Sequence, residues 1–152
     1  MNSHEFEPLI VAFFCHYCAY ASADLAGSMR LQYPPNIRIV RTPCTGRLEV
    51  EYYLRAFENG ADGVLVAGCL EGGCHFIEGN LLAKRRVNHT RDLLAEIGFE
   101  PERLRMVNVS AAMGRPLADI VTDMVKTVRE LGPNPLKSAS RNKKEQKDFV
   151  QT

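Results

Sequence analysis

The sequence has no apolar run that approaches the roughly 20 residues needed to span a bilayer. Its N-terminus, MNSHEFEP, is polar and acidic, so it lacks the basic start and apolar core of a secretory signal. We therefore expect no membrane span and a cytoplasmic location. An excess of one charge is missing as well, since 19 basic and 18 acidic residues give a net charge of +1. Such a balance offers no overall attraction for nucleic acid, and no nucleic-acid partner is expected.

The common motifs of nucleotide binding and catalysis are also missing. No G-x-G-x-x-G segment opens a helix, and no G-x-x-x-x-G-K-[ST] loop occurs. No Ser–His–acid or paired-carboxylate arrangement stands out either. The sequence therefore offers no candidate catalytic residue.

Four apolar segments alternate with four helix-like ones. The apolar segments, at residues 8–14, 36–41, 63–67 and 104–109, have the length and composition of strands. Helical spacing marks residues 19–29, 48–58, 80–97 and 117–131, with Gly60, Gly98 and Gly132 as stop signals. This order predicts an α/β fold, a four-stranded parallel sheet with flanking helices in flavodoxin-like or Rossmann-like order. The segment GVLVA at 63–67 is the most apolar and is expected at the centre of the sheet.

The C-terminal end of the chain differs in composition from the rest. Residues 1–136 are predicted to form one domain, long enough to bury a hydrophobic core. Residues 137–152 carry five basic and two acidic side chains and almost no apolar ones before Phe149. We expect this charged tail to be disordered, or to become ordered only on a partner.

Cysteine is the residue type whose positions are most informative. All five cysteines follow predicted strands and fall in strand-to-helix turns: Cys15, Cys18, Cys44, Cys69 and Cys74. The carboxyl ends of parallel strands share one edge of a sheet, so these side chains are expected to converge there. Five thiols cannot all pair within one chain, and structural disulfides are rare in a reducing compartment. Metal binding or redox chemistry at the carboxyl edge is therefore predicted.

Thiolates in such a cluster can hold zinc or an iron–sulfur cluster. Iron–sulfur is favoured because structural zinc normally uses two short C-x2-C knuckles, whereas one is present here. The four-residue gap between Cys69 and Cys74 resembles spacings of two-iron clusters. Gly72 and Gly73 are expected to let backbone N–H groups approach the sulfurs, which raises a cluster's potential.

Two alternatives remain open. One is an assembly adaptor that holds zinc or no metal. The other is a dithiol oxidoreductase that works through the C-x-x-C motif of Cys15 and Cys18, although three further cysteines on the same edge argue against it. His16 and His75, each beside a cysteine, are expected to be either loop residues or residues that contact the ligands without binding the metal. The basic run at residues 84–86 is either a solvated helix face or a surface that binds a partner protein.

Five segments together resemble a known family. They are FFCHYCAYASADLAGSMRLQYPPNIRIVR (13–41), CTGR (44–47), AFENGADGVLVAGCLEGGCHFIEGN (56–80), KRRV (84–87) and ELGPNPLK (130–137). On these residues the chain resembles the delta subunit of methyl-viologen-reducing hydrogenase, a family also found with heterodisulfide reductase modules. The charged tail is a departure from the family pattern, and so is the His-Tyr pair inside C-H-Y-C, where members often have Asn-Trp.

The resemblance implies a function in electron transfer. Residues 1–136 would form an iron–sulfur domain that carries one [2Fe–2S] cluster and serves as a non-catalytic subunit of an oxidoreductase complex in anaerobic metabolism. It would connect a hydrogenase, a formate dehydrogenase or a methylenetetrahydrofolate reductase to a heterodisulfide reductase-type A subunit that contains flavin and iron–sulfur clusters. Electron bifurcation or confurcation would take place at that flavin.

All five cysteines match the family's cysteine positions, one more than the four ligands that a [2Fe–2S] cluster needs. The first choices as metal ligands are Cys15, Cys44 and Cys69, together with one of Cys18 and Cys74.

Overall fold

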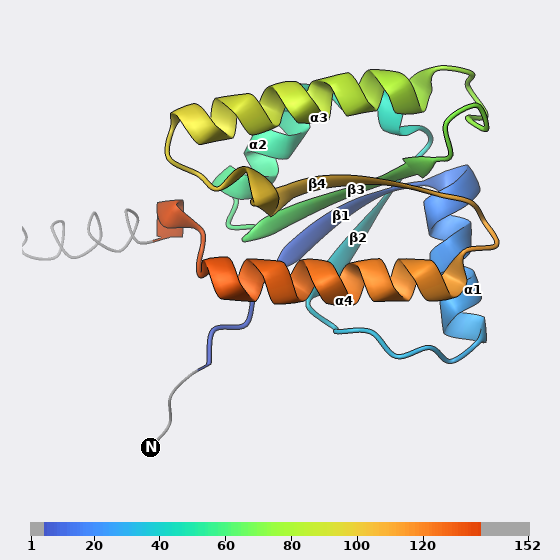
Figure 1. The fold of residues 1–152 in the computed structure, drawn as a ribbon, viewed down its shortest axis with the longest axis horizontal. Coiled ribbons are helices and arrows are strands. Elements are labelled where there is room, and N and C mark those ends of the chain that lie inside the picture. Colours follow the sequence, from blue (N-terminus) through green and yellow to red (C-terminus); the bar gives the residue numbers. More distant parts are fainter. Residues whose placement is uncertain (1–4, 138–152) are drawn as a thin grey trace, which may run out of the picture.

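The computed structural model describes residues 5–137, which are built around a four-stranded parallel sheet (Figure 1). Its strands are β1 (Ile10–Cys15), β2 (Ile37–Thr42), β3 (Gly63–Cys69) and β4 (Leu104–Val109), in the spatial order β2-β1-β3-β4. All neighbouring strands in this sheet are parallel. The predicted α/β fold is confirmed, and the order is that of the first four strands of a flavodoxin-like sheet.

Helices cover both faces of the sheet. On one face lie α1 (Ala21–Ser28) and α4 (Gly114–Leu131), and on the other α2 (Val50–Glu58) and α3 (Gly79–Glu96) (Figure 1). A π-helical turn, η1 (His16–Tyr20), precedes α1, and 3-10 turns, η2 (Thr45–Arg47) and η3 (Pro101–Arg103), precede α2 and β4. The four predicted helices are all present. Within residues 5–137, no helix is both long and apolar enough to cross a membrane.

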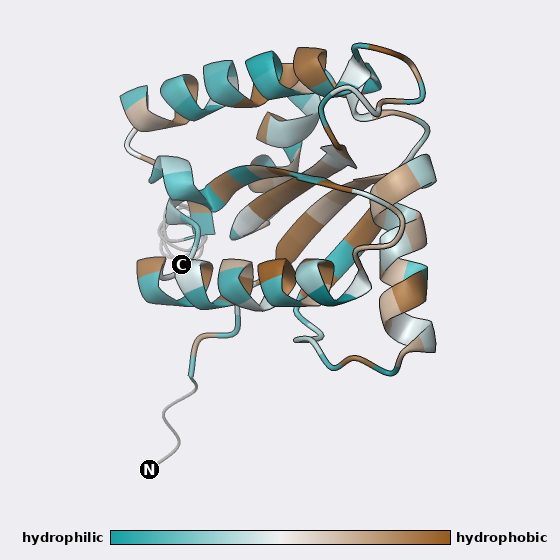
Figure 2. Cartoon of the chain, turned by 45° about the vertical axis from the view of Figure 1, so that its right-hand side comes forward, coloured by the Kyte–Doolittle hydropathy of each residue, from teal (hydrophilic) through white to brown (hydrophobic). Residues whose placement is uncertain are grey.

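β3 lies at the centre of the core. All of its residues are buried, and β1 and β4 pair with its two edges. Leu65 and Ala67 pack in the layer under α1 and α4, whereas Val64 and Val66 pack in the layer under α2 and α3. Figure 2 shows mostly apolar residues along the inner strands and polar residues along much of α3. The prediction that the GVLVA segment forms a central strand is therefore confirmed.

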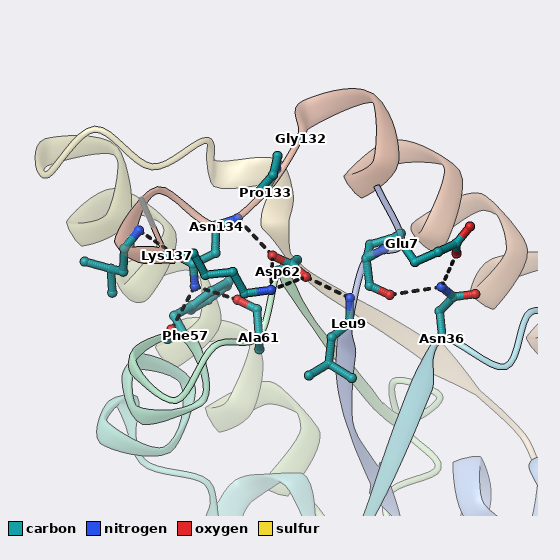
Figure 3. A network of polar contacts seen from close by, with 12 residues as sticks. Glu7, Leu9, Asn36, Phe57, Ala61, Asp62, Gly132, Pro133, Asn134 and Lys137 are labelled. Atoms are coloured by element: carbon teal, nitrogen blue, oxygen red, sulfur yellow. Dashed lines mark hydrogen bonds and ion pairs between the residues drawn. The ribbon is translucent and has the colours of Figure 1, made fainter. Parts of the chain in front are cut away.

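A buried carboxylate ties both ends of the domain to the amino edge of the sheet. Asp62, directly before β3, has no exposed surface and accepts hydrogen bonds from the backbone N–H groups of Leu9 and Asn134, both at 2.9 Å (Figure 3). Nζ of Lys137 lies 2.9 Å from each carboxylate oxygen. Lys137, assigned above to the charged tail, is thus held by the folded domain. The rest of that tail, residues 138–152, lies outside the described residues.

Arg103 completes the same edge. Its buried guanidinium donates to the backbone carbonyls of Asp62 and Gly132 at 3.0 and 2.9 Å. Nε of Arg103 also donates to the carboxylate of Glu100 at 2.7 Å, and this bond lowers the pKa of the Glu100 carboxyl. The charge of Arg103 is tolerated inside the protein because its N–H groups are paired. The segment 132–137 is therefore fastened to the sheet by both Asp62 and Arg103.

The network predicts unequal effects of removing its two charged partners. Asp62→Ala leaves two backbone N–H groups without an acceptor, so we expect the free energy of unfolding to fall by about 3 kcal/mol. Lys137→Ala is expected to cost about 1 kcal/mol, because its side chain is 43% exposed and water can replace it. Equilibrium urea unfolding of both variants measures the difference. Equal losses would mean that the ion pair, and not the backbone acceptor, makes the main contribution.

Candidate metal centre

The five cysteines meet at the carboxyl edge of the sheet, as the strand order predicts. Cys15 and Cys69 are the last residues of β1 and β3, and Cys44 lies two residues after β2. Cys18 belongs to η1, and Cys74 lies in the loop between β3 and α3. The loops that carry them gather on the right-hand side of the sheet in Figure 1.

Three of the sulfurs form a close group. The Sγ atoms of Cys15, Cys18 and Cys69 lie within 4.8 Å of one another, and all three residues are buried. Sγ of Cys15 is 3.7 Å from Sγ of Cys69. Parallel pairing of β1 with β3, which sets Phe14 opposite Ala67, brings these two strand ends to the same place. All five cysteines are free thiols.

Cys44 and Cys74 form a second pair beside the start of α3. Both sulfurs lie close to Gly79. A Cβ at this position would collide with Sγ of Cys44 and would lie 3.4 Å from Sγ of Cys74. Gly46 and Gly79 also approach each other closely: a Cβ on Gly46 would lie 2.7 Å from Cα of Gly79. Only glycine permits such a close approach of the two backbones. Cys44 lies directly before η2, the turn that contains Gly46. The two glycines therefore allow the second pair of sulfurs to form.

The π-helical turn directs hydrogen-bond donors at Cys15. The Cys18 thiol donates to Sγ of Cys15 and, with the backbone N–H of Tyr17, lowers the pKa of Cys15 to about 5. The pKa of Cys18 is raised, because its proton is shared with Cys15 and because the side chain is buried. Sequence spacing predicted a plain helix start at this point. The wider turn instead wraps both cysteines of the C-x-x-C motif around one position.

Backbone amides reach two further sulfurs. The N–H of Gly46 donates to Sγ of Cys44 at 3.4 Å, and the N–H of His75 donates to Sγ of Cys69. Burial nevertheless raises the pKa of both thiols, because the charged form loses its water. Binding of a metal ion would reverse this balance, since the amides would then stabilise the charge on metal-bound thiolates.

The glycines of the β3–α3 loop shape its turn. Gly72 has a φ of +80°, a conformation that favours glycine. The N–H of Gly73 donates to the carbonyl of Leu70 and so closes the loop on itself. The amide of this loop that reaches a sulfur is that of His75, which donates to Cys69.

Two asparagines that the sequence analysis did not single out hold the end of β3. Nδ2 of Asn80 donates to the carbonyls of Cys69 and Leu70 at 2.9 and 3.0 Å, and Nδ2 of Asn108 donates to the carbonyl of Cys69 at 2.6 Å. Asn80 is buried and is the second residue of α3, so it joins the helix start to the strand end. An asparagine at a helix start usually indicates a cap, so the sequence signal for this contact is weak.

Aromatic rings lie beside the cysteine group. The rings of Tyr17 and His75 stack with centroids 3.9 Å apart, and Phe76 meets Tyr17 edge-on. The close group of possible ligands within residues 5–137 consists of cysteines and includes neither His16 nor His75. His75 lies in the loop between β3 and α3, as expected, whereas His16 is the first residue of the turn η1.

The basic run at 84–86 is partly used within the fold. Lys84 pairs with Glu71 at 2.9 Å, and Arg86 pairs with Glu49 at 3.0 Å. Arg86 also donates to the carbonyl of Gly46 at 2.6 Å, which fastens η2 to α3. Arg85, between them, is exposed.

This set of donors fits a thiolate-bound metal centre better than a dithiol enzyme. A dithiol enzyme needs an attacking sulfur that its substrate can reach, whereas Cys15 is 2% exposed. The sulfur of Cys69, which is not part of the C-x-x-C motif, also lies 3.7 Å from that of Cys15. Zinc and iron both accept tetrahedral thiolate ligands, so the donors are compatible with either metal. Amide N–H groups aimed at the sulfurs are a typical feature of iron–sulfur sites.

The chain is similar to known proteins over nearly all of its described length. The profile of the family described as methyl-viologen-reducing hydrogenase, delta subunit, matches residues 10–132. The iron–sulfur D subunit of the F420-non-reducing hydrogenase of Archaeoglobus profundus is 48% identical over 131 residues, which cover 86% of this chain and 96% of that protein. The vhu iron–sulfur D subunit of the F420-non-reducing hydrogenase of Methanocaldococcus jannaschii is 46% identical over 132 residues, 87% and 98% of the two chains.

A relative of another kind contains the same domain within a longer chain. The A subunit of the ferredoxin:CoB-CoM heterodisulfide reductase of Methanosarcina mazei is 48% identical over 126 residues, which are 83% of this chain but 16% of that protein. The family profile and the full-length relatives agree with each other and with the cysteine-lined sheet edge. The chain belongs to the family of methyl-viologen-reducing hydrogenase delta subunits.

Proposed function

We propose that this chain holds one [2Fe–2S] cluster at the carboxyl edge of its sheet and relays electrons within a hydrogenase–heterodisulfide reductase complex. The observation that carries the proposal is the convergence of five free thiols at the carboxyl ends of three strands and in the connections that follow them, four of the five being buried. When bound, such a cluster takes up and releases one electron at a time. The absence of a recognisable catalytic motif agrees with a relay that performs no bond chemistry of its own.

The ligand set we propose consists of two sulfur pairs. Two thiolates about 2.3 Å from one tetrahedral metal ion lie about 3.8 Å apart. The 3.7 Å between the sulfurs of Cys15 and Cys69 is close to this value, so we assign this pair to one iron. We assign Cys44 and Cys74 to the other iron, because both of their sulfurs lie against Gly79.

Cys18 then remains as a hydrogen-bond donor to a ligand. Its sulfur lies within 4.8 Å of those of Cys15 and Cys69, and its thiol donates to Cys15. A donor to a ligand sulfur disperses negative charge and raises the reduction potential. The backbone N–H groups of Gly46 and His75 donate to Cys44 and Cys69, and these bonds also raise the reduction potential.

The protein also shields the site from water while keeping it near the surface. The stacked rings of Tyr17 and His75 line a cavity beside Cys18 and Cys69, and Cys44 and Cys69 are themselves buried. In a site of low dielectric with fixed amide dipoles, the surroundings rearrange little when the cluster gains or loses one electron.

The relatives support two kinds of partner. The iron–sulfur D subunits of F420-non-reducing hydrogenases suggest a hydrogenase as one of them. The related domain inside the A subunit of a heterodisulfide reductase suggests that an A-type subunit is the other, with electron bifurcation at its flavin. Formate dehydrogenase and methylenetetrahydrofolate reductase modules are the alternatives to hydrogenase, and a cytoplasmic location belongs to the same proposal.

The ligand assignment predicts different effects of two serine substitutions. Cys69→Ser is expected to remove the visible iron–sulfur absorbance, because one iron loses a thiolate. Cys18→Ser is expected to keep about two irons and two sulfides per chain, with a reduced-state signal at altered potential. Anaerobic purification, iron and acid-labile sulfide counts and electron paramagnetic resonance before and after dithionite measure both effects.

Two results would count against these assignments. Loss of the cluster in Cys18→Ser together with its retention in Cys74→Ser would exchange the roles of these residues. Stoichiometric zinc in the unaltered chain, or no metal in protein kept strictly from air, would refute the relay. The adaptor would then remain, as would the dithiol enzyme, for which turnover of a disulfide substrate is the direct assay.

The contact between Gly79 and two of the sulfurs gives an independent prediction. Gly79→Ala places a methyl group against the sulfurs of Cys44 and Cys74, so we expect the iron content to fall to less than about half of that of the unaltered chain. Gly27→Ala is the matched control, because no atom lies within 4 Å of its added Cβ and Gly27 lies in the last turn of α1. This control is expected to keep its iron and to leave the free energy of unfolding unchanged or slightly raised. Full iron content in Gly79→Ala would show that Cys44 and Cys74 do not need this position.

A further inference from the structure

A groove of about 620 Å³ opens beside Cys44, between η2 and the first turns of α3. Its walls are mostly apolar and include Pro43, Phe76, Leu81 and Leu82. Phe76 is 51% exposed and Leu82 is 40% exposed, and the neighbouring Ile77 is more exposed still. Apolar surface gathered around a hollow in this way is typical of a site that another molecule covers.

Two unpaired cations stand at the groove. Arg47 from η2 and Arg85 from α3 both line it, both are exposed, and neither forms an ion pair with another residue in the range 5–137. The nearby Lys84 and Arg86 have acidic partners within 3.0 Å. One carboxylate, that of Glu78, lines the groove, and it pairs with neither arginine. The charge available to an incoming molecule is therefore positive.

A second cavity on the same edge has a different character. It measures about 380 Å³ and lies beside Cys18 and Cys69, next to the stacked rings of Tyr17 and His75. No lysine or arginine lines it. The two openings thus lie beside different ligand cysteines and differ in charge, as expected if a relay meets its electron donor and its electron acceptor on separate surfaces.

We propose that the groove between η2 and α3 is the docking site for an apolar segment of one redox partner that carries acidic side chains. Its apolar residues cover Phe76 and Leu82, and its carboxylates pair with Arg47 and Arg85. Docking there brings the partner against the Cys44 side of the centre. This inference rests on the proposed relay function and adds to it the surface and the chemistry of one partner contact.

Charge reversal at the groove tests the proposal. The chain loaded with its cluster is titrated with the purified heterodisulfide reductase-type A subunit and, separately, with the purified hydrogenase module of the same organism. We expect the double variant Arg47→Glu/Arg85→Glu to bind one of the two at least about tenfold more weakly, because like charges then face each other. We also expect affinity of the unaltered chain for that same partner to fall as ionic strength rises.

The matched control is Lys126→Glu, an exposed charge on α4 on the opposite face of the sheet. It is expected to bind both partners like the unaltered chain. Unchanged binding of both partners to the double variant would overturn the proposal, as would equal weakening by Lys126→Glu. The iron count of the unaltered chain is a separate readout. A low count refutes the relay, whereas the affinities report on the groove itself.

Cross-linking in the assembled complex identifies the occupant without relying on charge reversal. A photo-reactive benzoylphenylalanine in place of Leu82 is expected to cross-link to a partner segment that contains Asp or Glu among apolar residues. The same group in place of Lys126 is expected to give no such product. Products confined to this chain, or a partner segment that is basic, would refute the proposed occupant.

Discussion

The fold depends on a strand that has no solvent-facing side. β3 is buried on both faces and paired on both edges, so polar groups at its two ends must be satisfied by side chains from other elements. At its amino end the carboxylate of Asp62 binds the backbone of Leu9 and Asn134. At its carboxyl end the carbonyl of Cys69 accepts hydrogen bonds from Asn80 and Asn108. Segments far apart in the sequence are thereby fixed at the two ends of one strand.

The two edges serve different purposes. The amino edge holds the fixed charges of Asp62 and Arg103, each matched by donors or acceptors, and binds the C-terminal segment to the domain. The carboxyl edge holds thiols, which pack as small apolar groups and form only weak hydrogen bonds with one another. Separating them keeps the buried charges of Asp62 and Arg103 away from sulfurs whose ionisation a bound metal must control. The stability of the domain can therefore rest on one edge while the other remains chemically adaptable.

A relay must expose its site to partners without exposing it to water. The sulfurs at the strand ends are buried, whereas the side chains around them, such as Tyr17, Phe76 and Leu82, are exposed and come from loops and a helix start. Loops at the end of a rigid sheet suit this task, because they present a contact surface while the strands hold the ligands in place. The apolar, positively charged groove beside Cys44 adds a surface on which one partner can be recognised separately from the other.

Much of this protein was determined by its sequence alone. Alternating apolar and helical segments led to the parallel sheet and a buried β3. Cysteines placed after strands led to the carboxyl edge, because the carboxyl ends of parallel strands share one edge of the sheet. Tertiary structure decided the grouping of the sulfurs, the amide donors to them and the roles of Asn80 and Arg103. It also decided that Gly46 meets Gly79. These contacts join residues distant in the sequence and depend on how η2 packs against α3, which is set by side-chain volumes across the interface and leaves no periodic signal in the chain.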